Sequence, residues 1–106
     1  MNKNEFEAFL LIYAAQTNFI ESEEEIAFIE SKFSANVINT VKSKIKSLND
    51  YQRLDFIIKY IKNNNYDNQE IESILLDIKT IYNSDGVFDR IEKTIYNSLK
   101  KLLKSI

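Results

Sequence analysis

One stretch of the sequence places oxygen-bearing side chains at a spacing that suits a divalent cation. When Gly86 is taken as the sixth position of an EF-hand-like loop, amide and carboxylate side chains fall at its positions 3, 5, 9 and 12. These candidate ligands are Asn83, Asp85, Asp89 and Glu92. Such oxygen ligands favour Ca²⁺ or Mg²⁺ over Zn²⁺ or Cu²⁺. The first position holds Ile81, which cannot ligate, so a cation site here is expected to be weak.

The same residues also suit an ordinary joint between two helices. Gly86 supplies a turn that tolerates positive φ. Asp89 followed by Glu92 has the spacing of a capping box, in which two side chains satisfy backbone N–H groups at a helix start. The sequence therefore leaves two interpretations of this joint open, a cation site and a capped turn.

A second acidic cluster lies near the N-terminus, at a joint that resembles the first. Its members are Glu21, Glu23, Glu24 and Glu25. Ser22 and Glu25 again have the spacing of a capping box, and glutamates in a first turn complement the helix dipole. The cluster is either a solvated helix start or an acidic surface for a cation or a basic partner.

The residue types that are missing exclude much catalytic chemistry. The chain has no His and no Cys, so it can form neither a Ser-His-Asp catalytic triad nor a Cys-His catalytic dyad. It also has no thiolate that could ligate zinc. Catalysis could rest only on carboxylates or tyrosines, and a small helical bundle offers little cleft to hold a carboxylate pair. We expect a protein that is not an enzyme.

These joints must be positioned by helices. The 106 residues include no Pro and a single Gly, which leaves few obligatory helix breaks. Apolar residues recur at helical spacing in six segments, and in the first of them one apolar face is made by Phe6, Phe9, Leu10, Tyr13 and Ala14. The predicted helix caps include Ser34, Asn49 with Gln52, and Asp67 with Glu70, and the run Asn63-Asn64-Asn65 predicts a turn. The segments span about 4–17, 22–33, 34–48, 50–63, 67–82 and 89–106. We expect an all-α, single-domain bundle of about six helices over residues 1–106, with the two similar joints suggesting two pseudo-symmetric halves.

Part of this pattern resembles a known family. The residues that carry the resemblance are Leu11-Ile12-Tyr13-Ala14-Ala15, then Ser22-Glu23-Glu24-Glu25-Ile26, and later Ser84-Asp85-Gly86-Val87-Phe88-Asp89 with Glu92. Together they resemble the tellurite-resistance TerB-like helical domains over about a third of the chain. The resemblance implies an all-helical fold with internal pseudo-symmetry, an acidic cation-binding surface and a role in stress-response complexes.

Charge is distributed unevenly along the chain. Residues 1–30 carry seven Glu and one Lys, whereas residues 42–62 carry six Lys or Arg and two Asp, and 90–106 carry five Lys or Arg and one Glu. The formal net charge is only −2, and the basic residues of 42–62 alternate around two helices, so we do not expect a nucleic-acid partner. No apolar run is long enough for a transmembrane segment, and the N-terminus does not resemble a secretory signal, so a cytoplasmic location is expected.

Three aromatic residues lie beside the predicted apolar stripes and suggest a protein-interaction surface. They are Phe28, Phe56 and Tyr60. Either their helices are central and fully packed, or the residues form an exposed patch for a partner or a second copy. The leading hypothesis is a non-enzymatic adaptor or stress-response sensor of the TerB-like kind that acts through protein contacts, with a weak divalent-cation site. The alternative is a metal-free module for protein interaction or homodimerisation.

Overall fold

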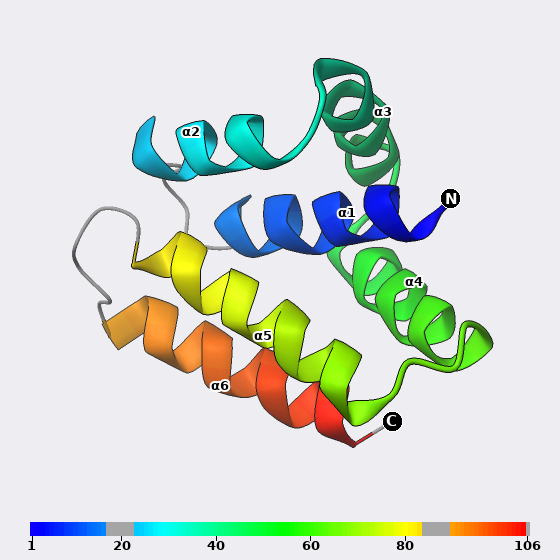
Figure 1. Cartoon of the computed structure of the whole chain (residues 1–106). Helices are drawn as coiled ribbons and strands as arrows, with labels where there is room; N and C mark the ends of the chain where they lie inside the picture. Colours follow the sequence, from blue (N-terminus) through cyan, green and yellow to red (C-terminus); the bar gives the residue numbers. More distant parts are fainter. Residues whose placement is uncertain (17–22, 84–89, 106) are drawn as a thin grey trace.

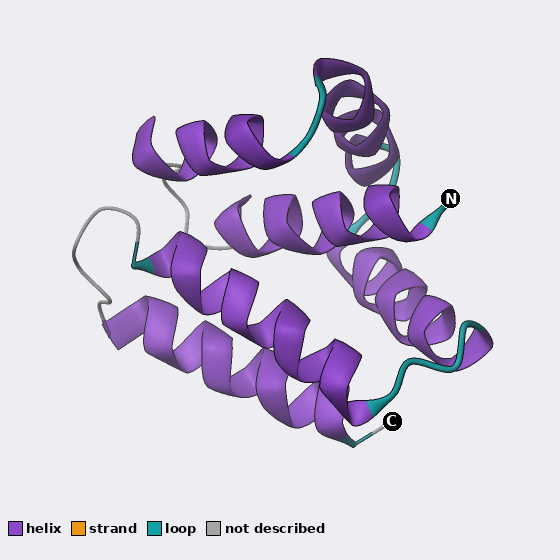
Figure 2. Ribbon diagram, in the orientation of Figure 1, coloured by secondary structure: helices purple, strands orange, loops and turns teal. Residues whose placement is uncertain are grey.

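The computed structural model describes residues 1–16, 23–83 and 90–105, and of Ile91 and Glu92 the backbone alone. Within these ranges the chain forms six α-helices and no strand, which confirms the predicted all-α bundle (Figures 1 and 2). The helices are α1 (Lys3–Gln16), α2 (Glu23–Lys32), α3 (Ala35–Lys46), α4 (Asp50–Asn63), α5 (Asn68–Tyr82) and α6 (Arg90–Lys104). None of the helices in the described ranges has the length and apolar character needed to cross a membrane.

Local capping determines where α3 and α4 begin. The Ser34 hydroxyl accepts a hydrogen bond from the backbone N–H of Val37 at 3.3 Å, as expected for an N-cap. At the next helix, Asn49 and Gln52 form a reciprocal capping box, with side chain-to-backbone distances of 2.8 and 2.9 Å. Both starts were predicted from the sequence, and both are confirmed.

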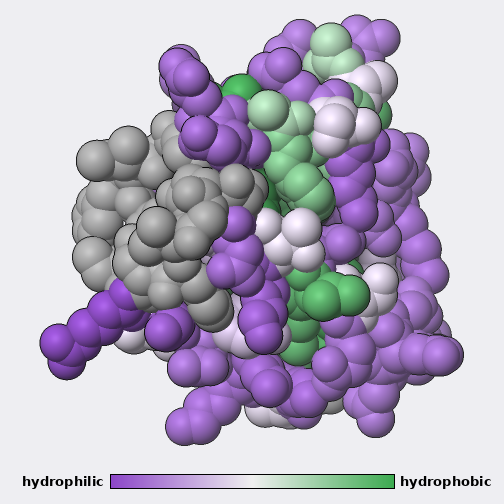
Figure 3. All heavy atoms as spheres, turned by 60° about the vertical axis from the view of Figure 1, so that its left-hand side comes forward, coloured by the Kyte–Doolittle hydropathy of each residue, from purple (hydrophilic) through white to green (hydrophobic). Residues whose placement is uncertain are grey.

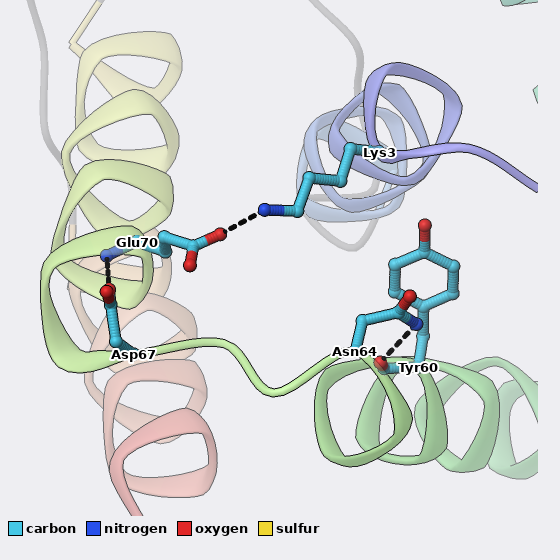
Figure 4. A network of polar contacts seen from close by, with 5 residues as sticks. All are labelled: Lys3, Tyr60, Asn64, Asp67 and Glu70. Carbon is cyan, nitrogen blue, oxygen red and sulfur yellow. Dashed lines mark hydrogen bonds and ion pairs between the residues drawn. The ribbon is translucent and has the colours of Figure 1, made fainter.

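The connection between α4 and α5 combines a turn with a long-range ion pair. Asn65, two residues after the end of α4, has a φ of 51°, the left-handed conformation that asparagine tolerates. This conformation turns the chain away from the α4 axis. The Asp67 carboxylate then accepts a hydrogen bond from the Glu70 N–H at 2.8 Å and caps α5. The Glu70 carboxylate reaches across to α1 and lies 2.6 Å from the Lys3 ammonium (Figure 4). The connection is therefore fastened to the start of the chain.

Helix α1 is the core of the bundle. Phe6 and every residue from Ala8 to Ala15 are buried, and α2, α3 and α5 pack around the helix (Figure 1). The sequence pattern predicted a single apolar face of Phe6, Phe9, Leu10, Tyr13 and Ala14. That prediction was too narrow, because Leu11, Ile12 and Ala15 on the other side of the helix are buried as well.

Helices α5 and α6 form a hairpin that closes one side of the bundle (Figure 1). The Tyr82 hydroxyl at the end of α5 donates a hydrogen bond of 2.7 Å to the Ala14 carbonyl oxygen, and this bond is buried. Helix α6 contributes Leu99 and Leu103 to the core. The hairpin is thus attached to α1 through apolar packing and one buried hydrogen bond.

Candidate functional site

The predicted cation site falls largely outside the described residues. Asp85 and Asp89 lie outside them, and so does the side chain of Glu92. Asn83 is exposed and ends α5, where its N–H donates to the Lys79 carbonyl oxygen. The described residues contain no group of three or more acidic side chains that could hold a metal ion. Cation binding stays a prediction, which melting in EDTA and in Ca²⁺ or Mg²⁺ can test.

The acidic cluster at the start of α2 divides into exposed and buried residues. Glu21 lies outside the described residues, and Glu23 and Glu24 are exposed. Glu25 is only 2% exposed, so its assignment to an acidic surface was wrong. The reason is helical spacing, because Glu25 precedes the buried Ile29 by four residues and lies on the same face of α2.

The predicted interaction patch is divided between two separate grooves. Phe28 lines a groove of about 490 Å³ together with Leu76, which belongs to α5 and is 63% exposed. Phe56 and Tyr60 line another groove, of about 450 Å³. All three aromatic residues are partly buried and pack against the core. Figure 3 shows hydrophobic residues gathered in a band on one face of the molecule, bordered by hydrophilic residues.

The second groove, here called the aromatic groove, lies along α4 and reaches the end of α3. Its apolar floor is made by Phe56, Tyr60 and Leu48, and its rim by polar residues. The rim residues are Lys44, Gln52, Asp55, Lys59, Asn63 and Asn64. A floor of large apolar groups with a polar rim is typical of protein interaction surfaces.

Core aromatic residues hold this floor in place. The Tyr60 ring stacks on the Phe6 ring with centroids 4.0 Å apart and planes inclined by 16°. The Phe56 ring lies 4.8 Å from that of Phe9. Tyr66 meets the edges of both Phe6 and Tyr60, at 5.8 and 6.2 Å. Because Phe6 and Phe9 are fully buried in α1, the exposed edges of Phe56 and Tyr60 rest on a rigid base.

Several basic residues of α3 and α4 are occupied by contacts within the fold. The Lys44 ammonium lies 5.4 Å from the centroid of the Phe56 ring, within the range of a cation–π interaction. Lys59 pairs with Asp55 at 2.9 Å, and this hydrogen bond raises the pKa of the Lys59 ammonium. Arg53 donates from Nε to the Ile45 carbonyl oxygen at 3.0 Å. The contacts of Lys44 and Arg53 therefore join α3 to α4, whereas the Lys59–Asp55 pair lies within α4.

Tyr66 completes the aromatic cluster and was not recognised in the sequence. It lies between helices, so no helical periodicity marks it as a packed residue. Its hydroxyl is buried and has no hydrogen-bond partner in the part of the chain that the structure describes. Burial raises the pKa of the Tyr66 hydroxyl to about 12. The Lys3 ammonium lies 5.0 Å from the centroid of its ring.

Comparison with known proteins returned no relative. No protein-family model, no curated protein and no solved structure matches the chain significantly. The resemblance to TerB-like domains accordingly stays a prediction that rests on the sequence motifs alone.

Proposed function

We propose that this protein is a non-enzymatic interaction module, an adaptor that binds an apolar segment of a partner protein in the aromatic groove. The observation that carries the proposal is the stacking of the partly exposed Tyr60 on the buried Phe6. The motif resemblance to TerB-like domains supports an adaptor or sensor in a stress-response complex. The residue types support a role without catalysis, since the sequence has neither His nor Cys.

Preorganisation makes this groove a favourable binding surface. Aromatic side chains supply a large share of binding energy at protein interfaces, and Tyr is among the residues enriched at energetic hot spots. A side chain that is already fixed loses little conformational entropy when a partner binds. Tyr60 is fixed by its ring contact with Phe6 and by a hydrogen bond of 3.1 Å from its hydroxyl to the Met1 carbonyl oxygen. Binding at this groove therefore carries a small ordering cost.

Site-directed photo-crosslinking tests the proposal. Because the chain has no Cys, Asn63→Cys on the groove rim accepts a single photo-reactive label. Ser73→Cys, on the exposed side of α5, is the matched control. When the purified, labelled protein is added to an extract of the cells that produce it and irradiated, the label at residue 63 should give one discrete adduct that the label at residue 73 does not give. Equal adducts from both positions, or none from residue 63, would contradict the proposal.

One observation favours homodimerisation as a second candidate function. Leu76 is 63% exposed beside the partly buried Phe28, and an apolar groove of this kind can be covered by a second copy. In that case the purified protein alone should show a melting temperature that rises with its own concentration. A melting temperature independent of concentration, with a monomeric mass in solution, would exclude the dimer.

A further inference from the structure

Helix α6 has two faces of opposite character. Leu99 and Leu103 are buried, and Ile95 and Tyr96 pack against the core. The opposite face is exposed and borders a shallow, open groove of about 650 Å³, whose lining includes Thr94, Asn97, Ser98, Lys100, Lys101 and Lys104. We call this the basic groove. In Figure 1, α6 lies on the outer side of α5, so this face points away from the bundle.

The charge of the basic groove is only partly neutralised by the fold. Lys104 forms an ion pair with Glu72 of α5. Lys100 and Lys101 form no ion pair in the described part of the chain. The described lining contains no acidic residue. The Glu72 carboxylate also feels the charge of Lys100, since Lys104 first and Lys100 after it lower the Glu72 pKa. Among the described residues, three exposed lysines therefore share this one carboxylate, and a positive excess remains on this face.

We propose that the basic groove binds an acidic segment of a partner protein. Lys104 follows Lys100 by four residues and Lys101 by three, so it lies one helical turn after both, and all three lysines belong to the exposed side of α6. Carboxylates of the bound segment pair with Lys100 and Lys101. Asn97 and Ser98, one turn earlier, offer amide and hydroxyl groups to the backbone of the segment.

The surroundings of α6 favour a protein over a membrane or a nucleic acid. An amphipathic helix that binds a lipid surface inserts its apolar face, but Leu99 and Leu103 are buried in the bundle. A long polyanion such as duplex DNA would also lie near the acidic parts of the chain, and the net charge of −2 would repel it. A short acidic segment contacts the groove alone. This inference concerns a different helix from the aromatic groove, so either proposal can fail without the other.

The test uses the full-length protein and a fluorescent octaglutamate peptide, with binding followed by anisotropy at about 50 mM salt, where screening is moderate. The triple variant Lys100→Gln/Lys101→Gln/Lys104→Gln should bind the peptide about tenfold more weakly, as expected for the loss of three charge contacts. The control variant Lys42→Gln/Lys46→Gln/Lys62→Gln removes the same charge from exposed positions on α3 and α4 and should bind nearly as well as wild type.

Three outcomes would overturn the inference. The first is the absence of octaglutamate binding by wild type. The second is equal weakening in both triple variants, which would mean that overall charge alone governs binding. The third is tighter binding, through the same α6 lysines, to vesicles of anionic phosphatidylserine or to duplex DNA than to the peptide.

Discussion

The aromatic groove and the basic groove differ in what supports them. The floor of the aromatic groove belongs to the core, since Tyr60 and Phe56 rest on Phe6 and Phe9. The basic groove is lined by side chains on the solvent side of α6, and they take no part in the core. The first groove therefore couples recognition to stability, whereas the second can change its charge while the fold stays intact. Substitutions at the two sites should separate these behaviours.

The largest effect is expected where the aromatic groove meets the core. Phe6→Ala removes a fully buried ring that contacts Phe56, Tyr60 and Tyr66. Loss of its apolar contacts and the cavity left behind should lower the free energy of unfolding by about 3–5 kcal/mol. Urea denaturation followed by circular dichroism measures this change. A loss below about 1 kcal/mol, the scale of a surface substitution, would show that the cluster does not support the groove floor.

Two tyrosine hydroxyls should respond differently to the same small change. Tyr82→Phe removes a buried hydrogen bond to the Ala14 carbonyl oxygen and should cost about 1–2 kcal/mol of stability. Tyr66→Phe removes a buried hydroxyl without a hydrogen-bond partner among the described residues, so it should leave stability unchanged or raise it. The two melting temperatures, measured side by side, check this difference. A reversed order would contradict the hydrogen bonding described for both residues.

Alkaline pH should lower the free energy of unfolding, because two buried tyrosine hydroxyls lie beside or within α1. Burial raises the pKa of Tyr66 to about 12, and burial together with the nearby Asp50 raises that of Tyr13 to about 12. In the unfolded chain a tyrosine loses its proton near pH 10, so between about pH 10 and 12 the unfolded state binds fewer protons and stability falls. Urea unfolding over this range should show the decline. The decline in the free energy of unfolding should be shallower in a Tyr13→Phe/Tyr66→Phe variant. An equal decline in the variant and the wild type would contradict the burial of these hydroxyls.

The smallest effect on stability is expected at the basic groove. Lys100→Gln/Lys101→Gln/Lys104→Gln should leave the melting temperature almost unchanged, because the three side chains are exposed and surface ion pairs contribute little. Differential scanning calorimetry at moderate salt measures this. A large drop in melting temperature would show that these lysines stabilise the fold. The two grooves would then not differ in their contribution to stability.

Local chemistry made much of the fold predictable. Ser34 and the Asn49–Gln52 pair cap helices as their types and spacing indicated, and Asn65 takes the left-handed turn conformation. Asp67 caps α5 as predicted, but the Glu70 carboxylate pairs with Lys3 and does not complete the predicted capping box. These features depend on a few neighbouring residues, which is why the sequence reveals them.

The candidate sites were less predictable because they depend on contacts between distant segments. Phe56 and Tyr60 were identified as surface candidates, but their stacking on α1 and the contribution of Tyr66 arise only from tertiary packing. Phe28 shares their residue type but lies in another groove. Glu25 is the exception, since its four-residue spacing from Ile29 already indicated the buried face of α2.

The most direct test of the interaction role is the affinity of the crosslinked partner for a blocked aromatic groove. Asn63→Arg places a longer side chain at the exposed rim and leaves Phe56 and Tyr60 in place, while Ser73→Arg adds the same charge on α5 outside the groove. By isothermal titration calorimetry, Asn63→Arg should weaken binding about tenfold or more, as expected when interface packing is disturbed. Ser73→Arg should bind like wild type. Equal affinities for all three proteins would contradict a binding role for the aromatic groove.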